Sequence, residues 1–286
     1  MREYRPIARY SHTPVLPSIF AKLCDNRPVL QLEAFEGDPD FVLSLARGLA
    51  VIEGFQDRPD GVTVGGVAAR TGLSRASVRR LLITLERLGY ASHNGPVYRL
   101  TSRALRLGFS FLSSNSLAAL ALPVLQEISA VIHESSSLSM LEGDEIVYLA
   151  RSATQRVMSV GLSVGSRLPA YCTSMGRVML ANLTKPEIAA YLGRVELQAR
   201  TPKSIVKKAA FAAELDRVRQ QGYAMVDEEL ELGLRSLAVP VRSRSGKVVA
   251  AINTGVQAAR STAKEMVKRF LPVLREGADR LSIALP

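Results

Sequence analysis

The chain has 286 residues, of which 47% are apolar and 22% are charged, and its formal net charge is +11. A chain of this length and composition can bury one or two sizeable cores, which favours a soluble globular protein. No uninterrupted apolar run approaches the roughly 20 residues that cross a bilayer, and no signal-type segment follows the N-terminus, so we expect a cytoplasmic protein that does not contact membranes. Cys24 and Cys172 are far apart and lack CxxC spacing, which indicates neither a disulfide framework nor a metal site.

The positive charge is concentrated in one segment. Residues 42–110 contain ten basic and four acidic side chains, a net charge of +6 in about a quarter of the chain, whereas residues 1–41 carry a net charge of −1. All ten basic residues of the middle segment are arginine, whose planar fork suits phosphate groups and guanine edges. A solvated helix face is the alternative, but this charge lies within a recognisable set of helices.

Two helices are expected at the start of this segment. Residues 41–55 are predicted to form an amphipathic helix that ends before Pro59-Asp60-Gly61. A short helix follows over residues 64–70 with Val67 and Ala68 facing inward, and Gly72 can take the positive φ of the turn after it. The apolar side chains of the first helix that recur near helical period are Val42, Leu45, Leu49, Ile52 and Phe55.

The third helix carries the arginines. It begins at Ser74, a residue type that caps helices by accepting a hydrogen bond from an N–H one turn on, and it ends at Gly89. The stripe expected to pack against the two preceding helices is Val78, Leu81, Leu82, Leu85 and Leu88. At about 100° per residue, the side chains that point away from this stripe are Ala76, Arg79, Arg80, Ile83 and Arg87.

A hairpin follows the third helix. Residues 90–100 contain two short β runs around Asn94-Gly95, a strong signal for a tight turn. Three helices and a hairpin predict a winged helix-turn-helix whose third helix enters the major groove of double-stranded DNA. The residues expected at base edges or the nearby backbone are Ser74, Arg75, Ala76, Ser77, Arg79 and Arg80. Those expected at phosphates or the minor groove are Arg87, His93, Asn94 and Arg99.

Beyond the hairpin, helices and strands are mixed. A linker helix is expected over residues 103–114 and a longer apolar helix over 117–133, and linkers of this kind pair subunits. Strands are predicted over residues 137–141, 145–151, 157–162, 224–227, 237–241 and 248–254. Helices are predicted after Thr173 or Ser174, after Thr184, over 211–221, and from Ser261 or Thr262, where Thr262-x-x-Glu265 resembles a capping box. This is an α+β arrangement with helices packed on one antiparallel sheet.

Several stretches resemble a known family. The segment 44–108 resembles the DNA-binding domain of the IclR-type transcriptional regulators, and VGSRLPAYCTSMGRVMLA (164–181) and DEELELGLRSLAVPV (227–241) look like the signature stretches of that family's effector domain. With GDEIVYLAR upstream, the first stretch is most similar to the branch that controls protocatechuate, 4-hydroxybenzoate and β-ketoadipate catabolism. The resemblance covers about residues 42–280. It implies an N-terminal extension (1–41), a winged helix-turn-helix domain (42–102), a linker helix (103–116) and a GAF-like effector-binding domain (117–286).

A ligand site is expected near Ser174. The start of a helix offers free N–H groups and the positive end of the helix dipole, which suit a carboxylate. Carried across by position, the effector contacts that the resemblance implies are Ser174, Met175, Asp227, Ser236, Asn253 and Thr254. Ser236 stands where some relatives have cysteine, so ligand chemistry can differ there. Arg151 and Arg167 are candidates for a counter-charge to an anionic ligand. Each of these residues alone has an ordinary structural explanation as a cap, a turn residue, a strand-end hydrogen bonder or a solvated charge.

Other functions stay open from the residues alone. An enzyme would need a dyad such as Cys172 with His133, and the chain has no nucleophile elbow, P-loop or HExxH motif. An architectural DNA-binding protein without a ligand would not need so long a second domain. We favour a homo-oligomeric regulator, either a homodimer or a dimer of dimers, that binds a DNA operator and responds to a small aromatic or dicarboxylic acid, without catalytic residues, metal or cofactor. The family branch favours an activator over a repressor, and an activator would also contact RNA polymerase.

Overall fold

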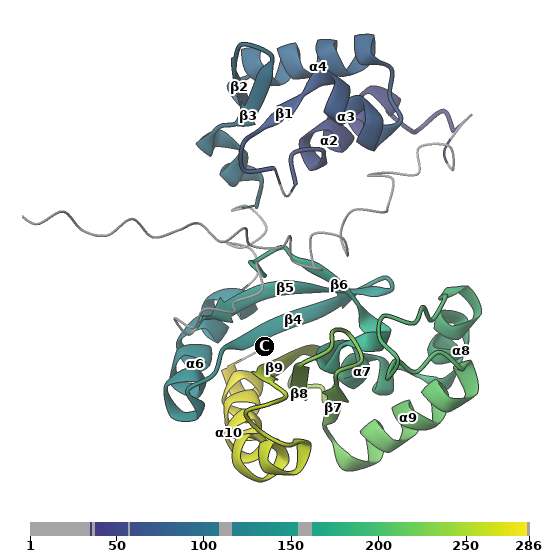
Figure 1. Ribbon diagram of the computed structural model, residues 1–286, viewed down its shortest axis with the longest axis vertical. Coiled ribbons are helices and arrows are strands. Elements are labelled where there is room, and N and C mark those ends of the chain that lie inside the picture. Colours follow the sequence, from purple (N-terminus) through teal and green to yellow (C-terminus); the bar gives the residue numbers. More distant parts are fainter. Residues whose placement is uncertain (1–34, 36–37, 57, 109–115, 154–161, 285–286) are drawn as a thin grey trace, which may run out of the picture.

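The computed structural model describes residues 35, 38–56, 58–108, 116–153 and 162–284, which form an N-terminal helical domain and a C-terminal domain built on a sheet (Figure 1). Most of the predicted extension 1–41 and almost all of the predicted strand 157–162 lie outside the described residues. The linker is described as far as residue 108: a 3₁₀ turn, η2 (Ser102–Ala104), is followed by helical residues 105–108.

The N-terminal domain contains three helices and a small antiparallel sheet with the strand order β1-β3-β2. Gly72 ends α3 at φ +71°, and the Ser74 hydroxyl accepts a hydrogen bond from the Ser77 N–H at 3.2 Å, as predicted. β1 is too short to show a pattern in the sequence. The elements are α2 (Leu43–Glu53), β1 (Val62–Thr63), α3 (Val64–Thr71), α4 (Arg75–Arg87), β2 (Ala91–Asn94) and β3 (Val97–Leu100).

The face that packs inward matches the predicted one only at and just after the end of α2, where Ile52 and Phe55 pack in the domain core. Val42, Leu45 and Leu49 are exposed, whereas Ala46 and Ala50 are buried. The prediction follows the larger side chains, but in this small domain α2 contacts α3 and α4 through a face that includes small alanines. On α4 the predicted stripe is confirmed at Val78, Leu82 and Leu85, is partly buried at Leu81, and fails at Leu88, which is exposed beyond the last turn.

The hairpin turn lies one residue later than predicted. Asn94 pairs with Val97, so Gly95 and Pro96 are the two turn residues. Gly95 has a φ of +58°, which a two-residue turn with glycine at its first position requires, and the fixed φ of proline suits the second position.

The C-terminal domain is built on one six-stranded antiparallel sheet in the order β6-β5-β4-β9-β8-β7. Its strands are β4 (Ser136–Glu142), β5 (Glu145–Ser152), β6 (Arg167–Pro169), β7 (Ala224–Asp227), β8 (Leu234–Arg242) and β9 (Val248–Gln257). Its helices are α6 (Ser116–Ile132), η3 (Ala170–Cys172), α7 (Ser174–Ala181), α8 (Lys185–Arg194), α9 (Lys208–Gln221) and α10 (Ala263–Ala284). The predicted α+β class is confirmed.

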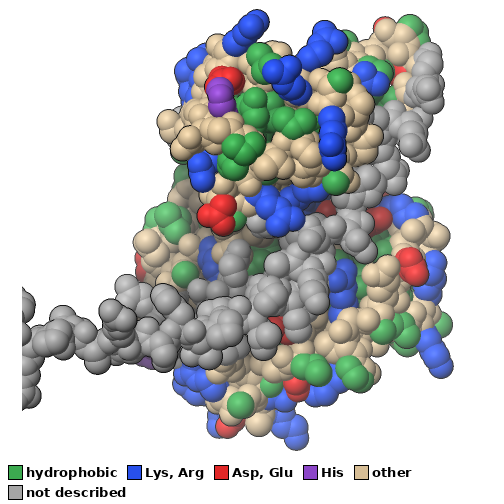
Figure 2. Space-filling model, turned by 45° about the horizontal axis from the view of Figure 1, so that its top comes forward, with side chains coloured by type: hydrophobic (Ala, Val, Ile, Leu, Met, Phe, Trp, Pro, Cys, Tyr) green, Lys and Arg blue, Asp and Glu red, His purple; other side chains and the backbone are tan. Residues whose placement is uncertain are grey.

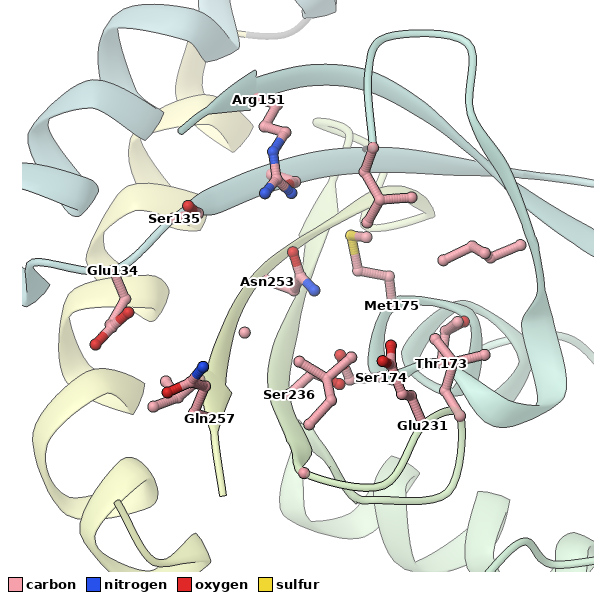
Figure 3. A pocket seen from close by; sticks show the side chains of 18 of the residues that line it. Glu134, Ser135, Arg151, Thr173, Ser174, Met175, Glu231, Ser236, Asn253 and Gln257 are labelled. Atoms are coloured by element: carbon pink, nitrogen blue, oxygen red, sulfur yellow. The ribbon is translucent and has the colours of Figure 1, made fainter. Parts of the chain in front are cut away.

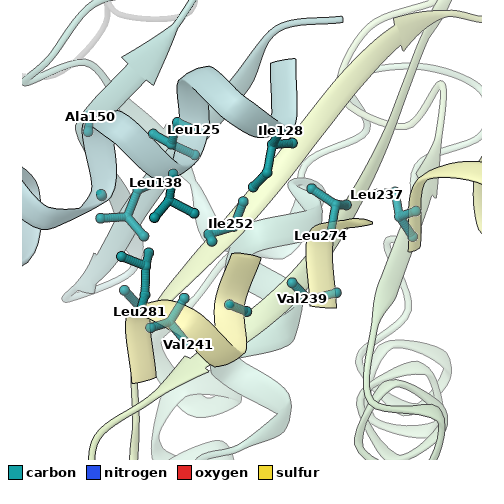
Figure 4. Packing of buried hydrophobic residues seen from close by; sticks show 14 of the residues in the cluster. Leu125, Ile128, Leu138, Ala150, Leu237, Val239, Val241, Ile252, Leu274 and Leu281 are labelled. Carbon is teal, nitrogen blue, oxygen red and sulfur yellow. The ribbon is translucent and has the colours of Figure 1, made fainter. Parts of the chain in front are cut away.

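The sheet separates two hydrophobic cores. Helices α6 and α10 cover one face, and α7, α8 and α9 cover the other (Figure 1). On β8, Leu237, Val239 and Val241 face α6 and α10, while Ala238 faces the α7 side. Figure 4 shows Leu237 and Val239 near Leu274 and Val241 beside Leu281. Because successive side chains of a strand point to opposite faces, β5, β8 and β9 contribute buried side chains to both cores.

Some element predictions need correction. One side of α6 packs inside its own domain, where Leu125, Ile128 and Ile132 are buried, whereas Leu120, Leu122 and Val131 on the same helix are exposed. No strand is predicted over residues 165–171, yet this segment contains the edge strand β6. The predicted capping box is present, since the Glu265 carboxylate accepts hydrogen bonds from the N–H and the hydroxyl of Thr262 before α10. None of the helices in the described ranges is long and apolar enough to span a membrane.

Candidate DNA-binding and effector-binding sites

The outward face of α4 presents its arginines to solvent. Arg75, Arg79 and Arg80 are exposed together with Ala76, and Figure 2 shows Lys and Arg side chains projecting from the domain at the top of the view. The Ser74 hydroxyl donates to the Ser77 hydroxyl at 3.0 Å, so both serines are used in the helix cap. The cap orients the first turn of α4, where the predicted base-edge residues lie.

The predicted flanking contacts lie on the end of α4 and on the hairpin. Arg87, Asn94 and Arg99 are exposed. His93 is also exposed, but its Nδ1 lies 2.5 Å from Glu86 Oε1, which ties β2 to α4. Part of the hydrogen-bonding capacity of His93 therefore serves the wing itself, and the remaining ring nitrogen is the one available to a phosphate.

A cavity of about 600 Å³ opens on the α7 side of the C-terminal sheet. Five of the eight predicted effector residues line it: Ser174, Met175, Ser236, Asn253 and Arg151. Figure 3 shows Arg151 at one end of the cavity, Ser174 at the other, and Asn253 between them. Its apolar wall is made by Leu162, Leu168, Met175, Leu230, Leu232, Leu234 and Val256. A cavity with an apolar wall and a few polar groups is typical of small-molecule sites.

The N-terminus of α7 forms one end of the cavity. Thr173, not Ser174, is the N-cap, and its hydroxyl accepts a hydrogen bond from the Gly176 N–H at 3.2 Å. The Ser174 hydroxyl is therefore free of capping, and it is buried without a hydrogen-bond partner. Only 1% of Ser174 is exposed. Buried hydroxyls in native proteins are normally hydrogen-bonded, so this one is suited to a ligand.

Arg151 supplies positive charge at the other end. Its Nη1 donates to the Ser137 hydroxyl at 3.3 Å, and no described carboxylate pairs with it. Burial lowers the pKa of Arg151, and burial raises the pKa of the neighbouring Tyr148 to about 12 although the charge of Arg151 opposes that shift. A desolvated guanidinium without a carboxylate partner attracts an anionic ligand.

Three predicted effector residues, Asp227, Thr254 and Arg167, do not line the cavity. Asp227 and Arg167 form ion pairs elsewhere, and Thr254 points to the other face of the sheet. Asp227 accepts a hydrogen bond from Arg235 Nε at 2.6 Å and lines a different cleft. Thr254 follows Asn253 on β9, so its side chain points to the opposite face, where its hydroxyl donates to the Ser135 carbonyl at 3.0 Å. Arg167, on the edge strand β6, donates to two glutamates, Glu142 and Glu145, at 2.9 Å.

Other polar residues line the cavity and were missing from the prediction. Glu231 has one carboxylate oxygen, Oε2, that is buried without a hydrogen-bond partner, and burial raises the pKa of this side chain. Glu134 forms an ion pair with Arg260, whose Nη1 lies 3.0 Å from Glu134 Oε1. The further polar members are Ser135, Ser137, Tyr148, Thr173 and Gln257. Alternation on β4 and β9 would have placed Ser137 and Gln257 on the cavity side, but no local pattern indicates Glu231, which lies on a loop.

A buried ion pair connects α7 to that loop. Arg177 is 1% exposed, and its guanidinium donates to both oxygens of Glu229 at 2.7 and 2.5 Å and to the Tyr171 carbonyl at 2.9 Å. Glu229 is followed by residues 230–234, all of which line the cavity. Planar bidentate pairing fixes geometry as well as charge. The pair therefore holds the cavity loop against the helix that carries Ser174.

The Cys172–His133 pair has no support in the structure. Cys172 is 1% exposed, and its thiol hydrogen-bonds to the Pro169 carbonyl. Burial raises the pKa of Cys172 to about 12, with opposing effects from Arg200 and Arg177 and none from His133. A buried thiol with a raised pKa is a poor nucleophile. His133 is exposed at the end of α6 with a φ of +57°.

Comparisons with known proteins identify the family. Residues 44–95 match the IclR helix-turn-helix domain, and residues 109–283 match the bacterial transcriptional regulator IclR C-terminal domain. The chain is 48% identical over 268 residues to the Pca regulon regulatory protein of Pseudomonas putida, covering 93% of this chain and 90% of that protein. It is 37% identical to the p-hydroxybenzoate hydroxylase transcriptional activator of Acinetobacter baylyi, covering 85% and 91%.

A solved structure extends the comparison to the C-terminal domain. It is that of a double mutant of the PobR inducer-binding domain from Acinetobacter in complex with 3-hydroxybenzoic acid. The likeness has a TM-score of 0.55 at 33% identity and covers 57% of this chain and 96% of that one. These relatives are transcriptional regulators and not enzymes. The chain therefore belongs to the IclR family of DNA-binding transcriptional regulators, which join a helix-turn-helix domain to an effector-binding domain.

Proposed function

We propose that this regulator controls aromatic-acid catabolism and that its effector is a small organic acid bound in the 600 Å³ cavity. The observation that carries the proposal is that one cavity contains both an Arg151 guanidinium without a described carboxylate partner and, at its other end, a buried Ser174 hydroxyl without a hydrogen-bond partner. The resemblance implies protocatechuate, 4-hydroxybenzoate or β-ketoadipate as the class of ligand, and the names of the relatives, a Pca regulon regulatory protein and a p-hydroxybenzoate hydroxylase transcriptional activator, agree with it.

DNA binding is assigned to α4 and the hairpin. The exposed Arg75, Arg79 and Arg80 follow a well-capped helix start, which is the part of a recognition helix that reaches base edges. Arg87, Asn94 and Arg99 are placed to contact the backbone that flanks the groove. The chain would act in the cytoplasm, as a homodimer or a dimer of dimers on its operator.

Regulation follows if the effector binds two arrangements of the oligomer with different affinity. The ligand would then shift the spacing of the paired DNA-binding domains through the linker helix. Coupling of this kind typically amounts to roughly 1–3 kcal/mol. We infer activation from the activator relative, in which case the bound regulator would also contact RNA polymerase.

The first test is a thermal-shift screen against protocatechuate, 4-hydroxybenzoate, β-ketoadipate, other aromatic acids and small keto acids. A ligand that binds only the folded state raises the melting temperature by mass action. We expect a saturable shift with at least one acid of the aromatic pathway. A flat response across the panel, in protein that still binds DNA selected from a random pool, would remove the organic-acid assignment and leave the DNA-binding assignment intact.

Two variants separate the sites. Arg80→Ala should weaken DNA binding and leave ligand affinity unchanged, because its side chain lies on the exposed face of α4. Ser174→Val combined with Asn253→Leu should abolish the thermal shift and leave DNA binding by the ligand-free protein unchanged. Equal loss of both activities in either variant would show that the two sites are not separable.

A further inference from the structure

We infer that Glu231 selects the effector's second polar group: the cavity takes an acid with a carboxylate at the Arg151 end and a hydrogen-bearing oxygen at the Ser174–Glu231 end. This inference rests on the proposed function, since it deepens the description of the same cavity. The hydrogen-bearing oxygen is a phenol or alcohol hydroxyl, or a second carboxyl group that shares a proton with Glu231.

The first step is that the cavity has two polar ends rather than one. Figure 3 shows Arg151 at one end and Ser174 with Glu231 at the other. Arg151 is the cation that no described carboxylate neutralises, whereas Arg260 is paired with Glu134 at 3.0 Å. The ligand's ionised carboxylate therefore belongs at the Arg151 end, where Ser137 lies within 3.3 Å of the guanidinium.

The second step is that the Ser174 end both donates and accepts hydrogen bonds. Ser174 is 1% exposed and its hydroxyl has no partner. The first N–H groups of α7 lie at the same end of the cavity, and the Thr173 hydroxyl accepts only from that of Gly176. Glu231 adds a carboxyl oxygen that is also buried and unpartnered. A hydroxyl satisfies both kinds of group at once, accepting from α7 and donating to Glu231.

The third step excludes a simple anion at this end. An ionised carboxylate of the ligand beside an ionised Glu231 would bury two like charges without a cation between them. The other titratable or charged groups around the cavity are Glu134, Arg260, Tyr148 and Arg151, and none of them offsets the effect of burial, which raises the pKa of Glu231. A dicarboxylic acid therefore fits only when one proton is held between its second carboxyl group and Glu231.

The experiment compares matched ligands by isothermal titration calorimetry. Benzoate and pentanoate have one polar end, and 4-hydroxybenzoate and adipate add a hydroxyl or a carboxyl group at the other. We expect one two-ended acid to bind wild-type protein at least about tenfold more tightly than its one-ended partner, as for a hydrogen bond to a charged group. In Glu231→Leu the ratio of the two affinities should fall to near one, and the affinity for the one-ended ligand should stay unchanged. Glu276→Gln, an exposed change outside the cavity, is the control.

The Glu231→Gln variant tells a ligand hydroxyl from a second ligand carboxyl group by proton uptake on binding. Because glutamine has the shape of glutamate, this variant is also expected to fold. If adipate is the preferred ligand, titrations in two buffers of different ionisation enthalpy should show proton uptake by wild type and none by Glu231→Gln. If 4-hydroxybenzoate is preferred, neither protein should take up a proton. An affinity ratio that stays unchanged in Glu231→Leu overturns the role of Glu231. Failure of all four acids to bind wild type would overturn this inference, whereas failure of the whole thermal-shift panel would overturn the proposed function.

Discussion

Arg177 shows how one buried charge serves the effector cavity. The side chain is 1% exposed and is satisfied by Glu229, by the Tyr171 carbonyl and by the ring of Phe211, 5.7 Å from the guanidinium carbon. The hydroxyls of Thr201 and Ser204 donate to the backbone carbonyls of Glu228 and Glu229 at 2.7 Å. The start of the loop that carries Glu231 is thus held by side chains from α7 and from residues 201–204.

Removing one partner of this ion pair should be costly. Arg177→Met leaves the Glu229 carboxylate buried without its cation, and we expect a loss of about 3–5 kcal/mol in the free energy of unfolding. Urea denaturation measures it. Arg177→Met combined with Glu229→Leu should recover part of the loss, because no unpaired charge remains. The control is Arg280→Met, whose exposed pair with Glu127 should contribute less than about 1 kcal/mol. Similar losses for both single variants would refute the special role of the buried pair.

Helix α7 is the element that the cavity depends on, and it approaches its neighbour closely at one glycine. A Cβ atom at Gly176 would lie 2.2 Å from the Ala170 carbonyl oxygen, which is backbone and cannot rotate away. Only glycine allows this approach, which sets the position of Ser174 two residues earlier. Gly193, inside α8, is the matched contrast, since a Cβ atom there would meet nothing within 4 Å.

The two glycines should respond to alanine in opposite directions. Gly176→Ala should lower the melting temperature and weaken effector binding, because either Ala170 or α7 must move. Gly193→Ala should raise stability by about 0.5–1 kcal/mol, since alanine is the better helix former and the space is free. Thermal unfolding with and without the effector measures both changes. Stabilisation by both substitutions would show that the contact at Gly176 relaxes easily.

At the scale of elements, helix caps and turns can be predicted from the sequence because they depend on residues that are near one another in the chain. The Ser74 cap, the Gly72 turn and the Thr262–Glu265 capping box are confirmed because each depends on residues within one turn. The inward face of α2 and the edge strand β6 depend on distant partners, so the first is predicted correctly only at Ile52 and Phe55 and the second is not predicted. Strand alternation separates Asn253, which lines the cavity, from Thr254, which points to the other face, and this alternation could have been applied to the sequence.

At the scale of the whole molecule, the net charge of +6 on residues 42–110 implies that salt weakens DNA binding. Each phosphate that an arginine neutralises releases counterions, so the logarithm of the binding constant falls with the logarithm of salt concentration. Arg87→Ala and Arg99→Ala should each reduce the magnitude of that slope by about 1. Fluorescence anisotropy between 50 and 200 mM salt, roughly the range over which this effect is large, measures it. Arg280→Ala, in the C-terminal domain, should leave the slope unchanged, and an equal effect there would contradict the assignment.

The two faces of the C-terminal sheet have different roles, so substitutions on them should have different consequences in evolution. The side chains that line the cavity from the strands, such as Ser137, Ser236 and Asn253, lie on the α7 face, while Leu237, Val239 and Ile252 support α6 and α10 on the other. A substitution on the first face can alter ligand preference without disturbing the larger core. Lineages of this fold could therefore acquire new effectors by drifting on one side of the sheet while purifying selection holds the other.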